Sequence, residues 1–164
     1  MTNLLTKGCS AGLSALLLLM SASATQAQTP GPEFINPSGL TKPSGYTHVV
    51  VSADRRTAYI AGQVAVDSTG KVVGVGDFKA QAEQVFANLQ RALASVNASF
   101  GDVVKTTTFI TDLKNLSTLR ETRSRYFDAS HAPANSLIPV ATLARPELLL
   151  EIEGVVDLSA KQKP

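Results

Sequence analysis

Residues 77–111 read DFKAQAEQVFANLQRALASVNASFGDVVKTTTFIT and contain a change of hydrophobic period. From Phe78 to Val96 the apolar residues recur at helical spacing, while polar residues such as Gln81 lie off that stripe. Asp77 is placed to cap the first turn. After Gly101, the β-branched run Val103–Thr111 is typical of a strand. This stretch therefore predicts an amphipathic helix followed directly by a strand.

The residues before this stretch predict strands and a turn. Val49–Val51 and Ala58–Ala61 flank the charged sequence Asp54-Arg55-Arg56, which favours a hairpin. Val64 and Val66 then run into the turn Asp67–Gly70.

The residues after it predict a second helix over Leu116–Phe127, with Asn115 as its cap, and two strands over Ser136–Leu143 and Leu148–Leu158. The expected order is ββαβαββ. An α+β sheet with both helices on one face is the simplest arrangement of these elements. The strands stay apolar on both faces, so we expect the uncovered face to pack against another copy in a homo-oligomer.

The N-terminus has the pattern of a secretory signal peptide. Lys7 is the only charge before Glu33, and it precedes a leucine-rich run that ends at Met20. Small residues follow, so cleavage is expected after Ala27, with Ala24 as the alternative. The apolar run is shorter than the roughly 20 residues of a membrane-spanning helix, which disfavours an uncleaved anchor. We expect a periplasmic or secreted product without a membrane segment.

The domain boundaries follow from these patterns. Residues 1–27 form the signal peptide, residues 28–45 an extended Pro- and Gly-rich leader, residues 46–158 one domain, and residues 159–164 a tail. The 15 basic and 13 acidic residues among 164 nearly balance, which argues against a nucleic-acid partner. Cys9 is the only cysteine, which excludes an intrachain disulfide and a cysteine zinc site.

Several short motifs are interpreted as structural. Ser68-Thr69-Gly70-Lys71 matches the S-x-x-K pattern of serine acylases, but Gly70 makes it a turn instead of a helix start. His48 and His131 are not at ligand spacing, so neither a metal nor a cofactor is expected. His131 is interpreted as a loop residue.

Glu151-Ile152-Glu153 places two carboxylates on one face of a strand, about 7 Å apart. They could lie on a solvated edge. Alternatively, the apolar residues on both sides indicate a buried strand, in which a carboxylate needs a partner or a shifted pKa. The sequence leaves both interpretations open.

In order along the chain, Gly62-Gln63, Asp102–Asp112, Pro133-Ala134 and Glu151–Glu153 resemble the Rid (reactive intermediate deaminase, YjgF-like or RidA-like) family over about residues 34–158. The resemblance implies a chorismate-mutase-like fold and a homotrimer with small-molecule clefts between subunits. It also implies that Tyr46 is the cleft tyrosine, Gly62 a backbone contact, and Glu151 the acid that orients the attacking water.

Asn135 departs from the family pattern, because deaminases of this family carry an arginine after Pro-Ala that holds the substrate carboxylate. Asparagine brings no charge, which makes neutral ligands more plausible. Arg145 lies in a loop one residue longer than the family would suggest, and it is a candidate replacement cation.

Three hypotheses follow for the function, and whether the chain is an enzyme stays open. The leading one is an exported Rid-like trimer that binds a small polar metabolite in its clefts, with Glu151 as general acid/base of a hydrolytic reaction. The second is an imine/enamine (2-iminoacid) deaminase that uses another cation, such as Arg145. The third is a non-enzymatic chaperone-like or interaction module.

Overall fold

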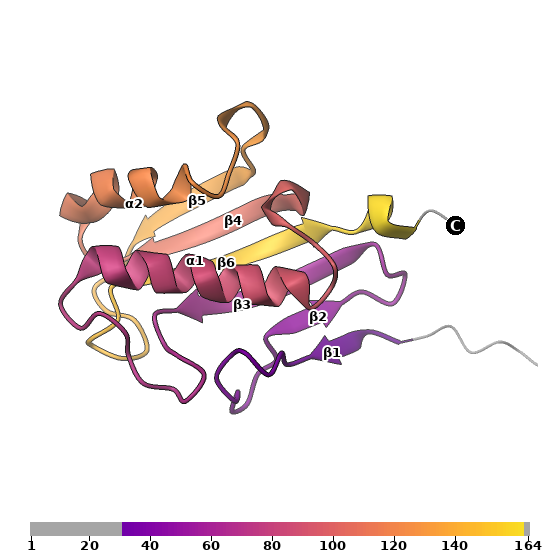
Figure 1. Cartoon of the computed structure of the whole chain (residues 1–164), viewed down its shortest axis with the longest axis horizontal. Coiled ribbons are helices and arrows are strands. Elements are labelled where there is room, and N and C mark those ends of the chain that lie inside the picture. Colours follow the sequence, from indigo (N-terminus) through magenta and orange to yellow (C-terminus); the bar gives the residue numbers. More distant parts are fainter. Residues whose placement is uncertain (1–30, 163–164) are drawn as a thin grey trace, which may run out of the picture.

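A computed structural model describes residues 31–162 and shows a six-stranded sheet with two α-helices on one face (Figure 1). The helices are α1 (Phe78–Ala94) and α2 (Leu116–Arg123). The strands are β1 (Glu33–Ile35), β2 (Val49–Val51), β3 (Thr57–Val64), β4 (Val103–Ile110), β5 (Ala134–Pro139) and β6 (Leu150–Asp157). The α+β class is confirmed, and so is the ββαβαββ order from β2 onward. The predicted signal peptide, residues 1–27, lies outside the described residues.

Strand β1 was not expected, because it lies within the Pro- and Gly-rich leader. It pairs antiparallel with β2, with Phe34 opposite Val50. Three residues between Pro32 and Pro37 are too few for an alternating pattern to be recognised in the sequence. The strand forms because β2 offers it an edge to pair with.

The strand order β1-β2-β3-β6-β4-β5 places β6 in the interior of the sheet (Figure 1). In its register, Glu151 lies opposite Val64 of β3 and Phe109 of β4. Among the strand pairs of residues 31–162, only β4 and β5 are parallel. The interpretation of Glu151 and Glu153 as residues of a solvated edge strand is therefore wrong.

Helix α1 packs across β3 and β6 and contacts α2 (Figure 1). The predicted cap is confirmed, since the Asp77 carboxylate accepts a hydrogen bond from the Ala80 amide at 3.1 Å. Phe86 of α1 stacks on Tyr126, with 4.7 Å between ring centroids, and Phe100 and Phe127 complete this aromatic cluster. Aromatic packing thus fixes the region after α2 against α1.

Helix α2 is shorter than expected and ends at Arg123, where turns replace the predicted last part. Asn115 occupies the N-cap position of α2, as predicted, but its side chain makes no capping hydrogen bond. A 3₁₀ turn over Leu113–Asn115 leads directly into α2, and Asp112 caps that turn by accepting from the Lys114 amide at 2.9 Å. The capping group therefore lies three residues earlier than the sequence indicated.

Two polar side chains of α1 are buried and tie the helix to the sheet. Gln81, expected off the apolar stripe, donates to the carbonyl of Glu147 at 2.7 Å and accepts from the Leu149 amide at 2.8 Å. Asn88 donates to the carbonyls of Val64 and Val66 at 2.9 and 2.8 Å. These bonds satisfy backbone groups where β3 ends and before β6 begins.

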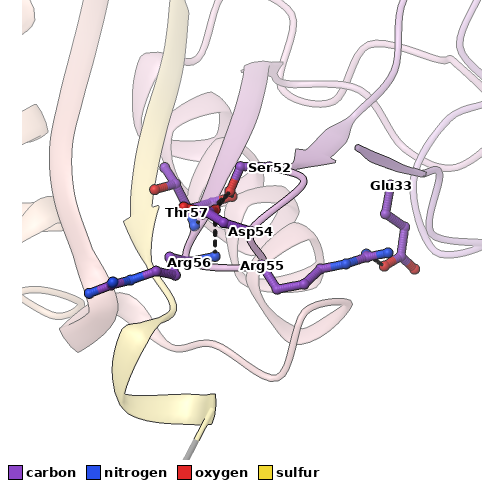
Figure 2. Close-up of polar contacts among 6 residues, drawn as sticks. All are labelled: Glu33, Ser52, Asp54, Arg55, Arg56 and Thr57. Carbon is purple, nitrogen blue, oxygen red and sulfur yellow. Dashed lines mark hydrogen bonds and ion pairs between the residues drawn. The ribbon is translucent and has the colours of Figure 1, made fainter. Parts of the chain in front are cut away.

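The β2–β3 hairpin turn is held by side chains of its own residues (Figure 2). The Asp54 carboxylate accepts from the Ser52 hydroxyl at 2.6 Å and from the Arg56 amide at 3.1 Å. Figure 2 shows Arg55 extending to Glu33 of β1, with which it forms an ion pair. The charged sequence predicted as a turn therefore also fastens β1 to the sheet.

The C-terminal end of the described region is a short turn. Ser159–Gln162, in the predicted tail, forms a 3₁₀ turn, and Lys161 lies 3.3 Å from the Asp102 carboxylate. Within residues 31–162, neither helix is long and apolar enough to cross a membrane.

Candidate functional site

A cavity of about 400 Å³ lies beside Glu151. We call it the Glu151 cavity. Its lining comes from the leader and the residues just after it, the end of β3 and the turn that follows, the loop before β6, and β6 itself: Thr41, Tyr46, Ala61, Gly62, Val64, Val66, Gly70, Ala144, Arg145, Leu148 and Glu151. Three of the four predicted site residues, Tyr46, Gly62 and Glu151, are therefore brought together.

Gly62 makes room for the Glu151 side chain. A Cβ atom at Gly62 would lie 1.8 Å from Glu151 Oε1 and 2.7 Å from its carboxyl carbon. Such a separation is far below van der Waals contact, so any larger residue would displace the carboxyl group. The glycine is needed here for close approach, because the Glu151 side chain occupies the space that a Cβ atom at Gly62 would fill.

Glu151 is half-buried and has no hydrogen bond or ion pair with any of the described residues. Burial raises the pKa of its carboxyl group, and the negative charge of Glu153 raises it further. Burial also raises the pKa of the Tyr46 hydroxyl, with a second contribution from the charge of Glu151. A carboxyl group shifted upward in a cavity can take up and release a proton closer to neutral pH than an exposed one.

A buried polar pair supports the wall of the cavity, and the sequence analysis missed it. His48 Nε2 lies 2.8 Å from the Thr41 carbonyl, and its Nδ1 lies 3.3 Å from Gln63 Nε2. This network assigns the proton to Nε2, which donates to Thr41, while Nδ1 accepts from Gln63. The Tyr46 ring meets His48 edge-on at 5.2 Å. His48 thereby links the leader to β3. The apolar run Val49–Val51 that follows it in the sequence gave no indication of this role.

Asn135, the fourth predicted site residue, does not line the Glu151 cavity. Its Oδ1 accepts hydrogen bonds from the hydroxyls of Thr106 and Thr108 at 2.9 and 3.1 Å. Both threonines are buried. Within one chain, Asn135 therefore serves as the acceptor for two buried hydroxyls that join β4 to β5.

Arg145, the candidate replacement cation, does line the Glu151 cavity. Its Nη1 donates to the Gly70 carbonyl at 2.9 Å, and its Nε lies 4.0 Å from a Glu147 carboxylate oxygen. The guanidinium thus bridges the turn after β3 and the loop before β6.

A second hollow, of about 320 Å³, lies beside Glu153. We call it the Glu153 hollow. It is lined by Lys105, Thr107 and the exposed Tyr59, among others. Lys105 Nζ donates to the Ser136 hydroxyl at 2.6 Å. Glu153 itself is exposed, in contrast to Glu151 two residues before it.

The other motifs have structural roles. The Ser68–Lys71 sequence forms a turn in which the Asp67 carboxylate accepts from the Thr69 amide and hydroxyl, at 2.8 and 2.7 Å. His131 is exposed in a 3₁₀ turn, as expected for a loop residue. Among residues 31–162, no three His, Cys, Asp or Glu side chains are grouped so that they could hold a metal ion.

Comparison with known proteins identifies relatives over most of the described chain. A RutC family protein, slr0709, from Synechocystis is 37% identical over 101 residues, which cover 61% of this chain and 77% of that protein. The human 2-iminobutanoate/2-iminopropanoate deaminase is 36% identical over 101 residues, covering 61% and 72%. The crystal structure of YyfA from Yersinia pestis, of the conserved Rid protein family, superimposes with a TM-score of 0.72 at 27% identity, covering 77% of this chain and 99% of YyfA.

The family model described as Endoribonuclease L-PSP matches residues 39–158. This range contains both α-helices and every strand from β2 to β6, and it leaves out only β1 among the strands described. It also includes all the residues that line the Glu151 cavity. The fold, the relatives and the order of the motifs therefore agree with the resemblance drawn from the sequence. The chain belongs to the Endoribonuclease L-PSP family, the family of the Rid and RutC proteins.

Proposed function

We propose that the protein hydrolyses the imine or enamine form of a small polar metabolite in the Glu151 cavity, with Glu151 as the general acid/base. The observation that carries this proposal is the half-buried Glu151 carboxyl group beside a cavity, without a cation or hydrogen-bond donor on it. Relatives that are 2-iminobutanoate/2-iminopropanoate deaminases support the reaction class.

Hydrolysis of an imine requires one group that exchanges protons with the attacking water and with the imine nitrogen. The Glu151 carboxylate takes a proton from a water molecule, and the water oxygen forms a bond to the imine carbon. The same carboxyl group then returns this proton to nitrogen, which gives a carbinolamine. Glu151 next takes the remaining hydroxyl proton and passes it to nitrogen, the carbon–nitrogen bond breaks, and a carbonyl product and ammonia leave. A raised pKa suits this double role, since the group must be both a usable base and a usable acid near neutral pH.

Tyr46 and Gly62 have supporting roles in this proposal. Gly62 lets the carboxyl group lie against β3, and its backbone is available to the ligand at the same place. Tyr46, with 48% of its surface exposed, lines the same cavity. Both residues thus shape the site around Glu151, and the proton transfers remain the role of Glu151.

We further propose that the protein is an exported homotrimer with its clefts between subunits. Tyr59, 54% exposed, and Val155 lie on the face of the sheet opposite the helices, where a second copy can cover them. Light scattering should then give three times the chain mass, and a monomer would contradict the intersubunit cleft.

Ribonuclease activity, which the family description names, has little support in this chain. Basic and acidic residues number 15 and 13, a net charge of only +2, which is a small excess for holding a phosphate backbone. A chaperone-like or interaction module would use the surface of the assembly, and substitutions in the cavity would then be silent.

Ammonia release from freshly generated 2-iminobutanoate tests the proposal. The purified protein should accelerate release over a control without protein, and the reaction product 2-oxobutanoate should inhibit it competitively. A rate equal to the control, together with no detectable binding of 2-oxobutanoate by calorimetry, would contradict both catalysis and binding in the cavity. Binding without acceleration would favour a non-catalytic metabolite-binding role.

A further inference from the structure

A hollow of about 230 Å³ is lined by the end of α2 and by the residues that lead from it towards β5. We call it the arginine hollow. Its lining contains two arginines and no aspartate or glutamate: Arg120, Arg123, Ser124, Phe127, Ala129 and Ala132. None of these residues lines the Glu151 cavity. Because α2 lies on the helix face of the sheet, the hollow is also separate from the face that we propose a second copy covers (Figure 1).

The two arginines lie on one side of α2, because residues three apart on a helix are neighbours. Leu119 and Thr122, on another side of the helix, are buried. The lining beyond the helix includes Ala129 and Ala132, whose side chains are too small to fill the space. Two guanidinium groups therefore border an open volume next to a short segment of small residues.

Neither guanidinium has a hydrogen bond or an ion pair with any of residues 31–162. Each of the other arginines in this range has at least one hydrogen-bond acceptor, as Arg125 does with Glu83 at 3.1 Å. The Nη2 atom of Arg123 is even buried without an acceptor. Burial also lowers the pKa of Arg123, as expected for a cation withdrawn from water without a counter-charge. A buried donor without a partner is costly, so an anion at this place would be stabilising.

The polar groups nearby do not neutralise the hollow. The Asp128 carboxylate accepts from the amide and hydroxyl of Ser130 at 2.9 and 2.8 Å, and it lies 3.8 Å from His131. Glu121 is exposed on α2, where adjacent residues point to different sides of the helix. The Ser124 hydroxyl already donates to the Glu121 carbonyl at 2.8 Å. The hollow therefore offers a ligand the positive charge and N–H donors of its two arginines.

We propose that the arginine hollow binds a phosphate group, carried by inorganic phosphate or by a small phosphate monoester. Two guanidinium groups match the nearly two negative charges that a phosphate monoester carries near neutral pH. Their planar sets of N–H donors suit its oxygens, and a single carboxylate brings only half of the charge. The small side chains of Ala129 and Ala132 leave room for the atoms attached to the phosphate. This site does not depend on the chemistry proposed for Glu151.

A purely structural role for Arg123 makes a different prediction. Its guanidinium carbon lies 4.8 Å from the centre of the Phe127 ring, and in that case this contact holds the segment after α2 in place. Stability would then depend on the arginine but not on phosphate. If Arg123 binds phosphate, the ligand should raise the unfolding temperature, because it binds only the folded state. Thermal unfolding with and without phosphate, at equal ionic strength, separates the two roles.

Calorimetry on the natural protein tests the ligand class and needs no variant to fold. Inorganic phosphate, glycerol 3-phosphate and acetate are titrated into phosphate-free buffer at the same ionic strength. Acetate should bind at least about tenfold more weakly than the better of the two phosphate compounds. Tighter binding of glycerol 3-phosphate would identify the ligand as an ester, and tighter binding of inorganic phosphate as the free ion. Binding of neither, or of acetate as tightly as phosphate, would overturn the proposal.

Variants then locate the binding. Arg120→Gln and Arg123→Gln should each weaken phosphate binding at least about tenfold, because each removes a charge-assisted contact. Arg123→Lys should fall between Arg123→Gln and the natural protein, since it keeps the charge but loses the planar set of donors. Arg125→Gln is the matched control, because Arg125 does not line the hollow and is paired with Glu83. Equal phosphate binding by Arg123→Gln and Arg125→Gln would overturn the assignment to this hollow.

Discussion

Glu151 and Glu153 lie two residues apart on the same face of β6, yet their surroundings differ. Glu151 is half-buried against Gly62, beside a cavity that also holds Tyr46. Glu153 is exposed, in a hollow that contains Lys105 and Thr107. Two identical side chains on one strand thus acquire different chemistry from what the neighbouring elements place over them. The position that favours an acid/base role is the one that is partly withdrawn from water.

The largest effect should come from Glu151→Gln, compared with Glu153→Gln. Removing the group that exchanges protons should lower kcat for imine hydrolysis by about 100-fold or more, the usual contribution of general acid–base catalysis. Glu153→Gln removes an equal charge from the same face and should change kcat by less than about threefold, since surface charge contributes little.

The rate of ammonia release at neutral pH gives kcat for both variants, and thermal unfolding checks that each is folded. Equal losses in the two variants would mean that the charge of this face matters and not the proton chemistry of one residue. The distinction between the two carboxylates would then be wrong.

A smaller but still large loss of catalytic activity is expected for Gly62→Ala. The new Cβ would meet Glu151 Oε1 at 1.8 Å, so the carboxyl group must leave its position. We expect a loss of about tenfold or more in kcat/KM, because misplacement of a catalytic group by about an ångström has effects of that order.

Gly154→Ala is the matched control on β6. A Cβ at Gly154 meets its nearest neighbour, the Lys105 carbonyl oxygen, at 3.5 Å, an ordinary contact. This variant should stay close to the natural protein in turnover. Activity of Gly62→Ala equal to that of Gly154→Ala would show that the position of the Glu151 carboxyl group is unimportant.

Asn135→Ala should lower stability, because it removes the acceptor for the buried hydroxyls of Thr106 and Thr108. A loss of about 1 to 3 kcal/mol in the free energy of unfolding is expected for groups left unsatisfied. Denaturant unfolding measures it, with Ser136→Ala, at the next residue of β5, as the comparison. Unchanged stability with reduced turnover would instead favour a direct contact between Asn135 and the ligand.

The smallest expected effect is on the way that the stability of the protein depends on pH. Because the pKa of Glu151 is raised on folding, the folded state favours the protonated carboxyl group. Its contribution to stability is complete below the ordinary carboxyl pKa and is lost as pH rises through the raised value. Glu151→Gln should therefore match the natural protein at pH 4 and unfold at a slightly higher temperature at pH 7. A variant less stable at pH 7 than at pH 4, relative to the natural protein, would reverse the sign.

The sequence was sufficient for the elements whose pattern is local. The 3.6-residue period from Phe78, the cap Asp77 and the β-branched run after Gly101 predicted α1 and β4. It was not sufficient for elements defined by a distant partner. Strand β1 depends on β2, and the burial of Gln81 depends on the backbone of Glu147 and Leu149, far away in the sequence. Polar groups that satisfy a buried backbone look like surface residues until their partners are known.

The residues of the candidate site likewise fall into those that the sequence predicted and those that it did not. Tyr46, Gly62 and Glu151 were predicted through the family resemblance, and the structure brings them to one cavity. The pairing of His48 with Gln63 and the engagement of Asn135 by two threonines follow from the register of the sheet, which no spacing in the sequence encodes. Arg145 was a candidate only by its loop, and its place in the lining depends on the contacts that fix that loop.

The most direct test of the account is the titration of the Glu151 carboxyl group, followed by ¹³C NMR on protein with labelled glutamate side chains. The Glu151 signal is assigned by its absence in Glu151→Gln. The account predicts a titration midpoint above the ordinary glutamate value, and a lower midpoint in Glu153→Gln, because burial and the Glu153 charge both raise the pKa of Glu151. A midpoint at or below the ordinary value would contradict the claim that Glu151 is set apart as the acid/base of this site.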